Sequence, residues 1–134
     1  MDFSSIVIME RDKETGLLHR EIGSYKVEEG AEYITRAYSE EDNVYIFFST
    51  DRDVEEWEYT AIYDLFPEDS FEEEGFETEF LDDEYNPTWR VKFKLEEEHS
   101  DMELKISKLC KLIKSGIEET MEEIKDKEDE YKEE

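Results

Sequence analysis

The order of apolar and polar positions predicts a series of strands over the first part of the chain. Two extended segments flank a turn that ends at Gly16, so residues 3–12 and 17–27 are expected to form a hairpin. A third strand is expected at 32–38. Residues 44–50 (VYIFFST) are apolar on both faces, which indicates a central strand of the sheet.

The segment from 54 to 66 fits two periods. At the helical period, one stripe forms, and Asp53 and Glu56 have the spacing of a capping box. At period two, Trp57, Tyr59, Ala61 and Tyr63 share one face. The density of Trp, Tyr, Thr and Ile favours a strand, and we expect it to pair with residues 44–50. The stripe of the helical alternative consists of Val54, Trp57, Ala61, Ile62 and Leu65.

Two further strands are predicted beyond Pro67. Residues 76–81 (FETEFL) are expected to form a short edge strand, and 88–95 (TWRVKFKL) alternate cleanly. In the second strand Val91, Phe93 and Leu95 point one way, and three bases point the other way. Acids on a neighbouring strand are the natural partners for these bases, and Glu56 and Glu58 are expected to supply them. The three bases are Arg90, Lys92 and Lys94.

The C-terminal part predicts one long helix. Ser100 and Glu103 have the spacing of a capping box, and apolar residues then recur in steps of three and four. This stripe is expected to pack on the sheet, and the alternative is a coiled-coil seam that makes a homodimer through the helix. Residues 126–134 are expected to fray into solvent. The stripe consists of Met102, Ile106, Leu109, Ile113, Ile117, Met121 and Ile124.

Together these elements predict an α+β protein, an antiparallel β-meander of about six strands followed by one long C-terminal α-helix packed on the sheet. The length of 134 residues fits a single domain, which we expect to span residues 1–125.

Composition adds an unusually acidic balance. The formal net charge is −26, and residues 53–89 contain 15 acidic residues and no Lys or Arg. Such a chain would be repelled by nucleic acid and by an anionic membrane surface, so neither is expected as a direct ligand. The N-terminus lacks the basic region of a secretory signal, and no apolar run has the length of a membrane span. A cytoplasmic protein is expected.

Several kinds of chemistry have no support in the residues. With two histidines far apart and one cysteine, no spacing matches a zinc site. Cys110 lies on the apolar stripe and is expected to be a buried structural thiol. The five glycines are isolated, so no phosphate-binding loop is present. We therefore expect no cofactor and no enzymatic activity.

Hard cations are an alternative ligand. Two acidic segments offer oxygen ligands of the kind that Ca²⁺ and Mg²⁺ prefer, although neither has the glycine and the later glutamate of an EF-hand. The alternative function is therefore a divalent-cation-binding domain. The candidate ligands are Asp51, Asp53 and Glu55 in one segment and Asp82, Asp83 and Glu84 in the other.

The segment 72–85 (EEEGFETEFLDDEY) raises the main functional hypothesis. Aromatic residues interleaved with acids suit a docking face for a basic partner protein, with the aromatics as apolar anchors inside an anionic rim. Two alternatives remain, an exposed connection that stays hydrated and a nucleic-acid mimic that inhibits a DNA- or RNA-binding protein. The candidate partner-binding residues are Glu72, Glu73, Glu74, Phe76, Glu77, Glu79, Phe80, Asp82, Asp83, Glu84 and Tyr85.

Overall fold

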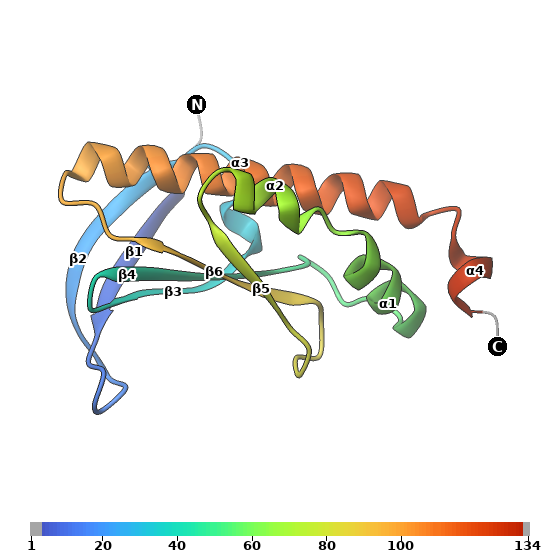
Figure 1. Cartoon of the computed structure of the whole chain (residues 1–134), viewed down its shortest axis with the longest axis horizontal. Coiled ribbons are helices and arrows are strands. Elements are labelled where there is room, and N and C mark those ends of the chain that lie inside the picture. Colours follow the sequence, from blue (N-terminus) through green and yellow to red (C-terminus); the bar gives the residue numbers. More distant parts are fainter. Residues whose placement is uncertain (1–3, 133–134) are drawn as a thin grey trace.

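A six-stranded sheet carries one long helix along one of its faces (Figure 1). The computed structural model describes residues 4–132; the expected starting residue of the first strand, residue 3, therefore lies outside the described residues. The strands are β1 (Ser4–Arg11), β2 (Leu18–Val27), β3 (Ile34–Glu40), β4 (Asn43–Ser49), β5 (Glu77–Leu81) and β6 (Thr88–Lys94). The helices are the 3-10 turn η1 (Ala31–Tyr33), α1 (Glu56–Leu65), α2 (Glu68–Glu73), α3 (His99–Ile124) and α4 (Glu128–Lys132).

The α+β class is confirmed, and the expected pure meander is corrected in one place. The strand order is β2-β1-β3-β4-β6-β5, and β1 pairs with β3 in parallel through Met9–Tyr38 and Glu10–Ser39. All other strand pairs are antiparallel. Because β2 takes the outer edge, the chain returns through η1 to the free side of β1, and β3 must then run in the direction of β1. The sheet is therefore mixed.

The segment 54–66 is helical, so the predicted strand is wrong. Residues 56–65 form α1, and the places beside β4 are taken by β3 and β6. Trp57, Ala61 and Ile62 are buried, as the helical stripe requires. The helix starts with a capping box of Glu55 and Glu58 rather than the expected Asp53 and Glu56. In this box the Glu58 carboxylate accepts the backbone N–H of Glu55 at 2.8 Å.

The acids that face β6 also differ from the expectation. Arg90 pairs with Glu79 at 2.5 Å, and Lys92 lies opposite Glu77 in the register of β5. Glu58 instead pairs with Arg52 at 3.0 Å. The expected edge strand at 76–81 is confirmed as β5, and it supplies the carboxylates that α1 was expected to provide.

The long helix α3 packs on the sheet as predicted. Its apolar stripe is buried against the protein's own strands, including Met102, Ile106, Leu109 and Ile113. The expected capping box of Ser100 and Glu103 does not form, because the helix begins at His99 with Glu98 as its N-cap. The Glu103 carboxylate accepts the Lys26 backbone N–H at 2.7 Å and so joins α3 to β2.

An aromatic cluster fixes α1 and α2 against the sheet. Phe48 on β4 and Trp89 on β6 stack with ring centroids 5.0 Å apart. Phe66, which follows α1, lies 4.3 Å from Trp89, and Phe71 on α2 lies 5.7 Å from Phe48. These four side chains are buried, and they hold the two short helices beside β5 and β6.

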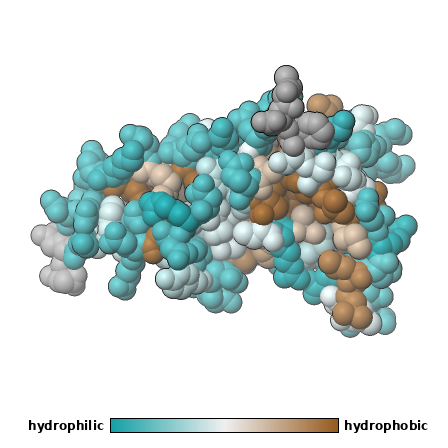
Figure 2. Space-filling model, turned by 180° about the vertical axis from the view of Figure 1, so that it is seen from behind, coloured by the Kyte–Doolittle hydropathy of each residue, from teal (hydrophilic) through white to brown (hydrophobic). Residues whose placement is uncertain are grey.

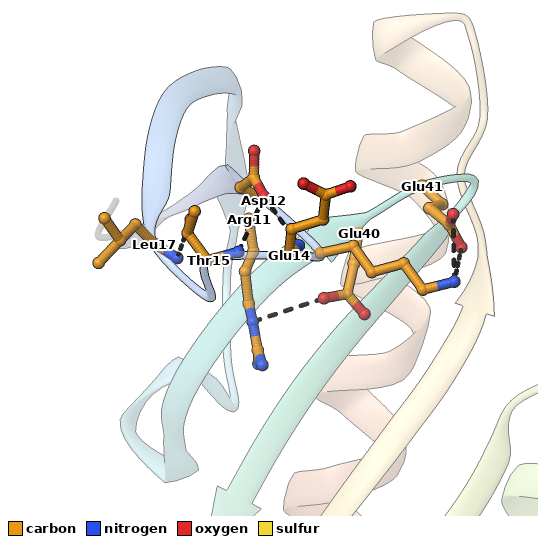
Figure 3. A network of polar contacts seen from close by, with 8 residues as sticks. Arg11, Asp12, Glu14, Thr15, Leu17, Glu40 and Glu41 are labelled. Atoms are coloured by element: carbon orange, nitrogen blue, oxygen red, sulfur yellow. Dashed lines mark hydrogen bonds and ion pairs between the residues drawn. The ribbon is translucent and has the colours of Figure 1, made fainter.

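Polar contacts join the two turns at one end of the sheet (Figure 3). In the β1–β2 turn, the Asp12 carboxylate accepts the backbone N–H groups of Glu14 and Thr15 at 2.8 and 3.0 Å. Arg11 pairs with Glu40 at 3.5 Å, across to the β3–β4 hairpin. These contacts fix the ends of β1 and β3 near their short parallel pairing.

The C-terminal segment differs from the expected frayed tail. Residues 128–132 form α4, which packs beside α1, and the Tyr131 hydroxyl donates to the Asp64 carboxylate at 3.0 Å. Ile124, at the end of α3, is buried. The last part of the expected tail, residues 133–134, lies outside the described residues.

Candidate functional site

The acidic segment 72–85 is ordered into three structural parts. Its first residues end α2, the middle forms β5, and the last form the turn between β5 and β6. Phe76 is only 1% exposed and packs edge-on against Phe93 with centroids 5.5 Å apart. It cannot reach a partner, so its assignment as an apolar anchor is corrected: it belongs to the core.

Phe80, on β5, contacts two aromatic residues of α1. It lies 5.8 Å from Tyr59 and 4.8 Å from Tyr63, measured between ring centroids. Both tyrosines project from the same side of α1, because residues four apart share a helix face. Phe80 also packs edge-on against Trp89 at 5.5 Å, which fixes the group to β6.

These aromatic side chains line a hollow in the surface between α1 and β5. Its volume is about 530 Å³, and Thr60, Glu68 and Asp82 complete the lining formed by Tyr59, Tyr63 and Phe80. A smaller hollow of about 370 Å³ lies alongside and shares Tyr63 and Glu68. Asp64 and Asp69 line this second hollow. Aromatic rings and carboxylates thus surround one continuous depression.

Glu68 is the most sheltered acid of the depression. Burial raises its pKa, and the nearby carboxylates of Glu72 and Asp69 act in the same direction. The indole N–H of Trp89 donates to the Glu68 carboxylate at 3.2 Å, which opposes the rise and orients the side chain. A cationic group in the hollow would relieve the cost of keeping Glu68 charged.

The turn after β5 extends this region. Asp82, Asp83 and Glu84 are exposed, and Tyr85 is 80% exposed. The Tyr59 hydroxyl donates to the backbone carbonyl of Glu84 at 3.3 Å, so the turn is attached to α1. We call this region the acidic aromatic surface; it consists of Tyr59, Tyr63, Glu68, Phe80, Asp82, Asp83, Glu84 and Tyr85.

The other predicted acids are engaged within the protein or lie apart. The Glu72 carboxylate accepts the Thr78 N–H at 3.1 Å, and Glu74 pairs with Lys108. Glu77 and Glu79 face the bases of β6. Glu73 is exposed on α2. Of the predicted partner-binding residues, the structure thus brings Phe80 and Asp82 into the hollow and places Asp83, Glu84 and Tyr85 beside it.

The candidate cation ligands do not form a cage. The Asp53 carboxylate accepts the side-chain N–H of Asn86 at 2.9 Å, and Glu55 serves the cap of α1. Asp51 is exposed and lines a hollow that also includes Glu55 and Trp57. Within residues 4–132 no group of three or more His, Cys, Asp or Glu side chains has an arrangement that could hold a metal ion.

Cys110 is buried on α3, as expected from its place on the stripe. Burial raises the pKa of its thiol to about 12, so the reactive thiolate is scarce at neutral pH.

The sequence interpretation missed three site residues: Glu68, which lies outside the predicted segment 72–85, and the two tyrosines Tyr59 and Tyr63. The segment 54–66 was assigned to a strand of the sheet, in which the side chains of Tyr59 and Tyr63 would have shared one face with Trp57 and Ala61. Their spacing of four residues was the available signal, because on a helix it places both rings together.

The fold and this surface define the class of protein: a small α+β domain with a helical layer on one face of a mixed sheet and an acidic, aromatic surface beside it. The chain belongs to DUF6762, a family of unknown function whose model matches residues 1–132. Comparisons with curated proteins and with solved structures found no match. Among the described residues, no helix is both long and apolar enough to cross a membrane.

Proposed function

We propose that the protein is a non-enzymatic interaction domain that binds a basic partner protein through the acidic aromatic surface. The observation that carries the proposal is the hollow itself. Three aromatic side chains and two carboxylates line it, in a part of the chain where residues 53–89 contain no Lys or Arg. A reduced, buried Cys110 is compatible with the cytoplasm, where we place this function.

The chemistry of the hollow suits a Lys or Arg side chain of the partner. The alkyl stem of such a side chain can pack on Tyr63 and Phe80, while its charge faces Glu68 and Asp82. A cation over an aromatic face contributes about 0.5–2 kcal/mol, depending on how far it is desolvated. Tyr63 is 55% exposed, so its ring is available for this contact.

Long-range electrostatics favour the same partner class. A net charge of −26 attracts a basic protein and accelerates the encounter. In the β5–β6 turn, Asp82 lines the hollow and Asp83 and Glu84 lie beside it, and these exposed acids would form the rim of the contact. Rim charges act mainly on the association rate, whereas buried aromatic anchors act mainly on dissociation.

Affinity capture from cytosol, with the full chain as bait, tests this proposal. A specific partner is expected to be retained at about 0.1 M salt and released at about 0.5 M, because the screening length shortens over this range. Two variants should lose the same partner: Tyr63→Ser, and the triple variant Asp82→Asn, Asp83→Asn, Glu84→Gln.

The matched control removes three acids from the exposed side of α3: Glu119→Gln, Glu122→Gln, Glu123→Gln. It changes the net charge by the same amount and should retain the partner. Equal loss with the control variant would show that capture depends on total charge and not on this surface. If the retained protein binds nucleic acid and DNA or RNA displaces it, the surface acts by nucleic-acid mimicry.

A further inference from the structure

The face of the sheet opposite α3 is covered by no helix in the part of the chain that the structure describes. Val44, Ile46 and Phe48 on β4 are buried toward α3, so the alternate residues Tyr45 and Phe47 point to the other side. We call this side the open face; its central residues are Val7, Arg36, Tyr38, Tyr45, Phe47 and Arg90.

Aromatic rings and guanidinium groups pack together on the open face. Tyr38 and Tyr45 stack with centroids 5.3 Å apart. The guanidinium carbons of Arg11 and Arg36 lie 4.9 and 5.1 Å from the centre of the Tyr38 ring, and that of Arg90 lies 5.6 Å from Tyr45. These contacts hold the arginine side chains against the rings, so less side-chain entropy remains to be lost on binding.

Charges of both signs alternate around these rings. Arg90 pairs with Glu79, Arg11 pairs with Glu40, and Lys92 lies opposite Glu77. The open face is therefore close to neutral, in a chain whose net charge is −26. If a second copy approached most other surfaces of this protein, the acidic residues of the two copies would repel each other.

We propose that two copies of this chain associate through their open faces, related by a two-fold axis. A two-fold contact sets one patch against itself, which requires a patch that is self-complementary. Bases and acids alternate on this face, so the bases of one copy can meet the acids of the other around the half-buried rings of Tyr45 and Phe47. The acidic aromatic surface is not part of this contact, and the inference is independent of the proposed function.

The size of the face is adequate for a dimer. Six strands about 4.8 Å apart and about seven residues long, with a rise of about 3.3 Å, give a projected area on the order of 550 Å². A standard interface buries about 800 Å² of accessible surface per partner, and a face with side chains has more accessible surface than its projection.

One exposed apolar side chain lies on this face. Val7 is 44% exposed on the open side of β1. Seen from behind, hydrophobic side chains gather over the half of the molecule that carries the β1–β2 hairpin, whereas the half that ends in α4 is mostly hydrophilic (Figure 2).

Sedimentation velocity of the full chain tests the inference, over about 10 to 500 µM protein. We expect a monomer–dimer equilibrium that becomes stronger as salt rises from about 0.05 to about 0.3 M, because screening reduces the repulsion between two copies that each carry many acids. This salt dependence has the opposite sign to that expected for the basic partner.

Two variants locate the contact. Arg36→Glu and Val7→Glu each place an acid on an exposed position of the open face, and each should weaken dimerisation at least tenfold. Lys111→Glu, on the exposed side of α3, changes the net charge by the same amount as Arg36→Glu and should leave the dimer intact. Thermal unfolding of each variant verifies that the fold is retained.

A chain that remains monomeric at every concentration and salt would overturn the inference. So would a dimer that both open-face variants leave intact. If Leu104→Ser, at the most exposed apolar position of α3, abolishes such a dimer, the contact lies on the helix instead.

Discussion

Gly30 shows how a single residue allows the connection before η1 to approach α3 closely. Its φ of 92° lies in the left-handed region, and a Cβ atom there would collide with the backbone carbonyl oxygen of Cys110. Gly75, with a φ of 90°, has no atom within 4 Å of such a Cβ. The two glycines share the backbone requirement; Gly30 is buried against α3, whereas Gly75 is exposed and free of this collision.

Alanine at these two positions therefore separates backbone strain from collision. We expect Gly75→Ala to lower the free energy of unfolding by about 1–2 kcal/mol, the usual cost of a left-handed backbone for a residue with a Cβ. Gly30→Ala should lower it further, by about 2 kcal/mol or more beyond that, because the helix backbone must move. Urea unfolding measures both values, and equal losses would mean that α3 does not approach Gly30 as described.

The raised pKa of Glu68, in the hollow, predicts that the free energy of unfolding depends on pH. Burial raises its pKa, so the charged form is destabilised in the folded state. A group with a raised folded pKa favours folding below its unfolded value of about 4.3, and this contribution is lost as the pH rises through the folded pKa. Glu68→Gln should therefore be more stable than the wild type at pH 7.

The same variant should lose its advantage below about pH 4, where the wild-type side chain is protonated as well. Urea midpoints at pH 7 and pH 3.5 give the comparison. A Glu68→Gln protein that is less stable than the wild type at pH 7 would show that the bond from Trp89 outweighs burial. Glu73→Gln, at an exposed position of the same helix, is the control.

At the scale of elements, α1 shows where the sequence interpretation failed. Aromatic and β-branched residues favoured a strand over 54–66, but propensity is weaker than tertiary context. The helical stripe of Trp57, Ala61 and Ile62 was visible and turned out to be the buried side. In the sheet, β3 and β6 pair with the two edges of β4 and leave no room for a strand from 54–66. A local sequence pattern does not show which strands pair.

The cap of α1 can be tested by a matched pair. The Glu58 carboxylate accepts the Glu55 N–H and pairs with Arg52, whereas Glu56 in the same turn is exposed. We expect Glu58→Ala to lower the free energy of unfolding by about 1 kcal/mol, as the loss of a capping interaction does, and Glu56→Ala to change it much less.

This effect also depends on pH. The hydrogen bond from Arg52 is the main reason that the pKa of Glu58 is lowered. A lowered pKa stabilises the fold above the unfolded value of about 4.3 and ceases to do so as the pH falls through the folded value. The difference between the two alanine variants, measured by urea unfolding, should shrink in acid; a difference that is unchanged at pH 3 would contradict the role of the ion pair.

Other elements were predictable because their signals are local. The hairpin of β1 and β2, the central strand β4, the alternating strand β6 and the stripe of α3 all follow from periodicity and turn residues. The parallel pairing of β1 and β3 was not predictable, because it depends on which edge β2 occupies. Phe80 was found as a candidate because it lies within the acidic segment. Its neighbours Tyr59 and Tyr63 were not found, because only the folded chain brings them beside Phe80.

At the scale of the whole molecule, the net charge of −26 opposes the compact state. We expect the melting temperature to rise by several degrees when NaCl increases from about 0.02 to about 0.5 M, because the screening length falls from roughly 20 Å to roughly 4 Å. Calorimetry at constant pH and protein concentration measures the shift. A melting temperature that falls with salt would mean that the ion pairs contribute more than the repulsion does.

The central claim is that the acidic aromatic surface, and not the acidity of the protein as a whole, recognises basic partners. The most direct measurement is an NMR titration of the ¹⁵N-labelled full chain with a short lysine-rich peptide at about 0.15 M salt. We expect saturable shifts concentrated on α1, β5 and the 82–85 turn, with the amides of Tyr63 and Phe80 among the largest, and their loss in Tyr63→Ser. Shifts of equal size around Glu119, Glu122 and Glu123 on α3, unchanged in that variant, would contradict the claim.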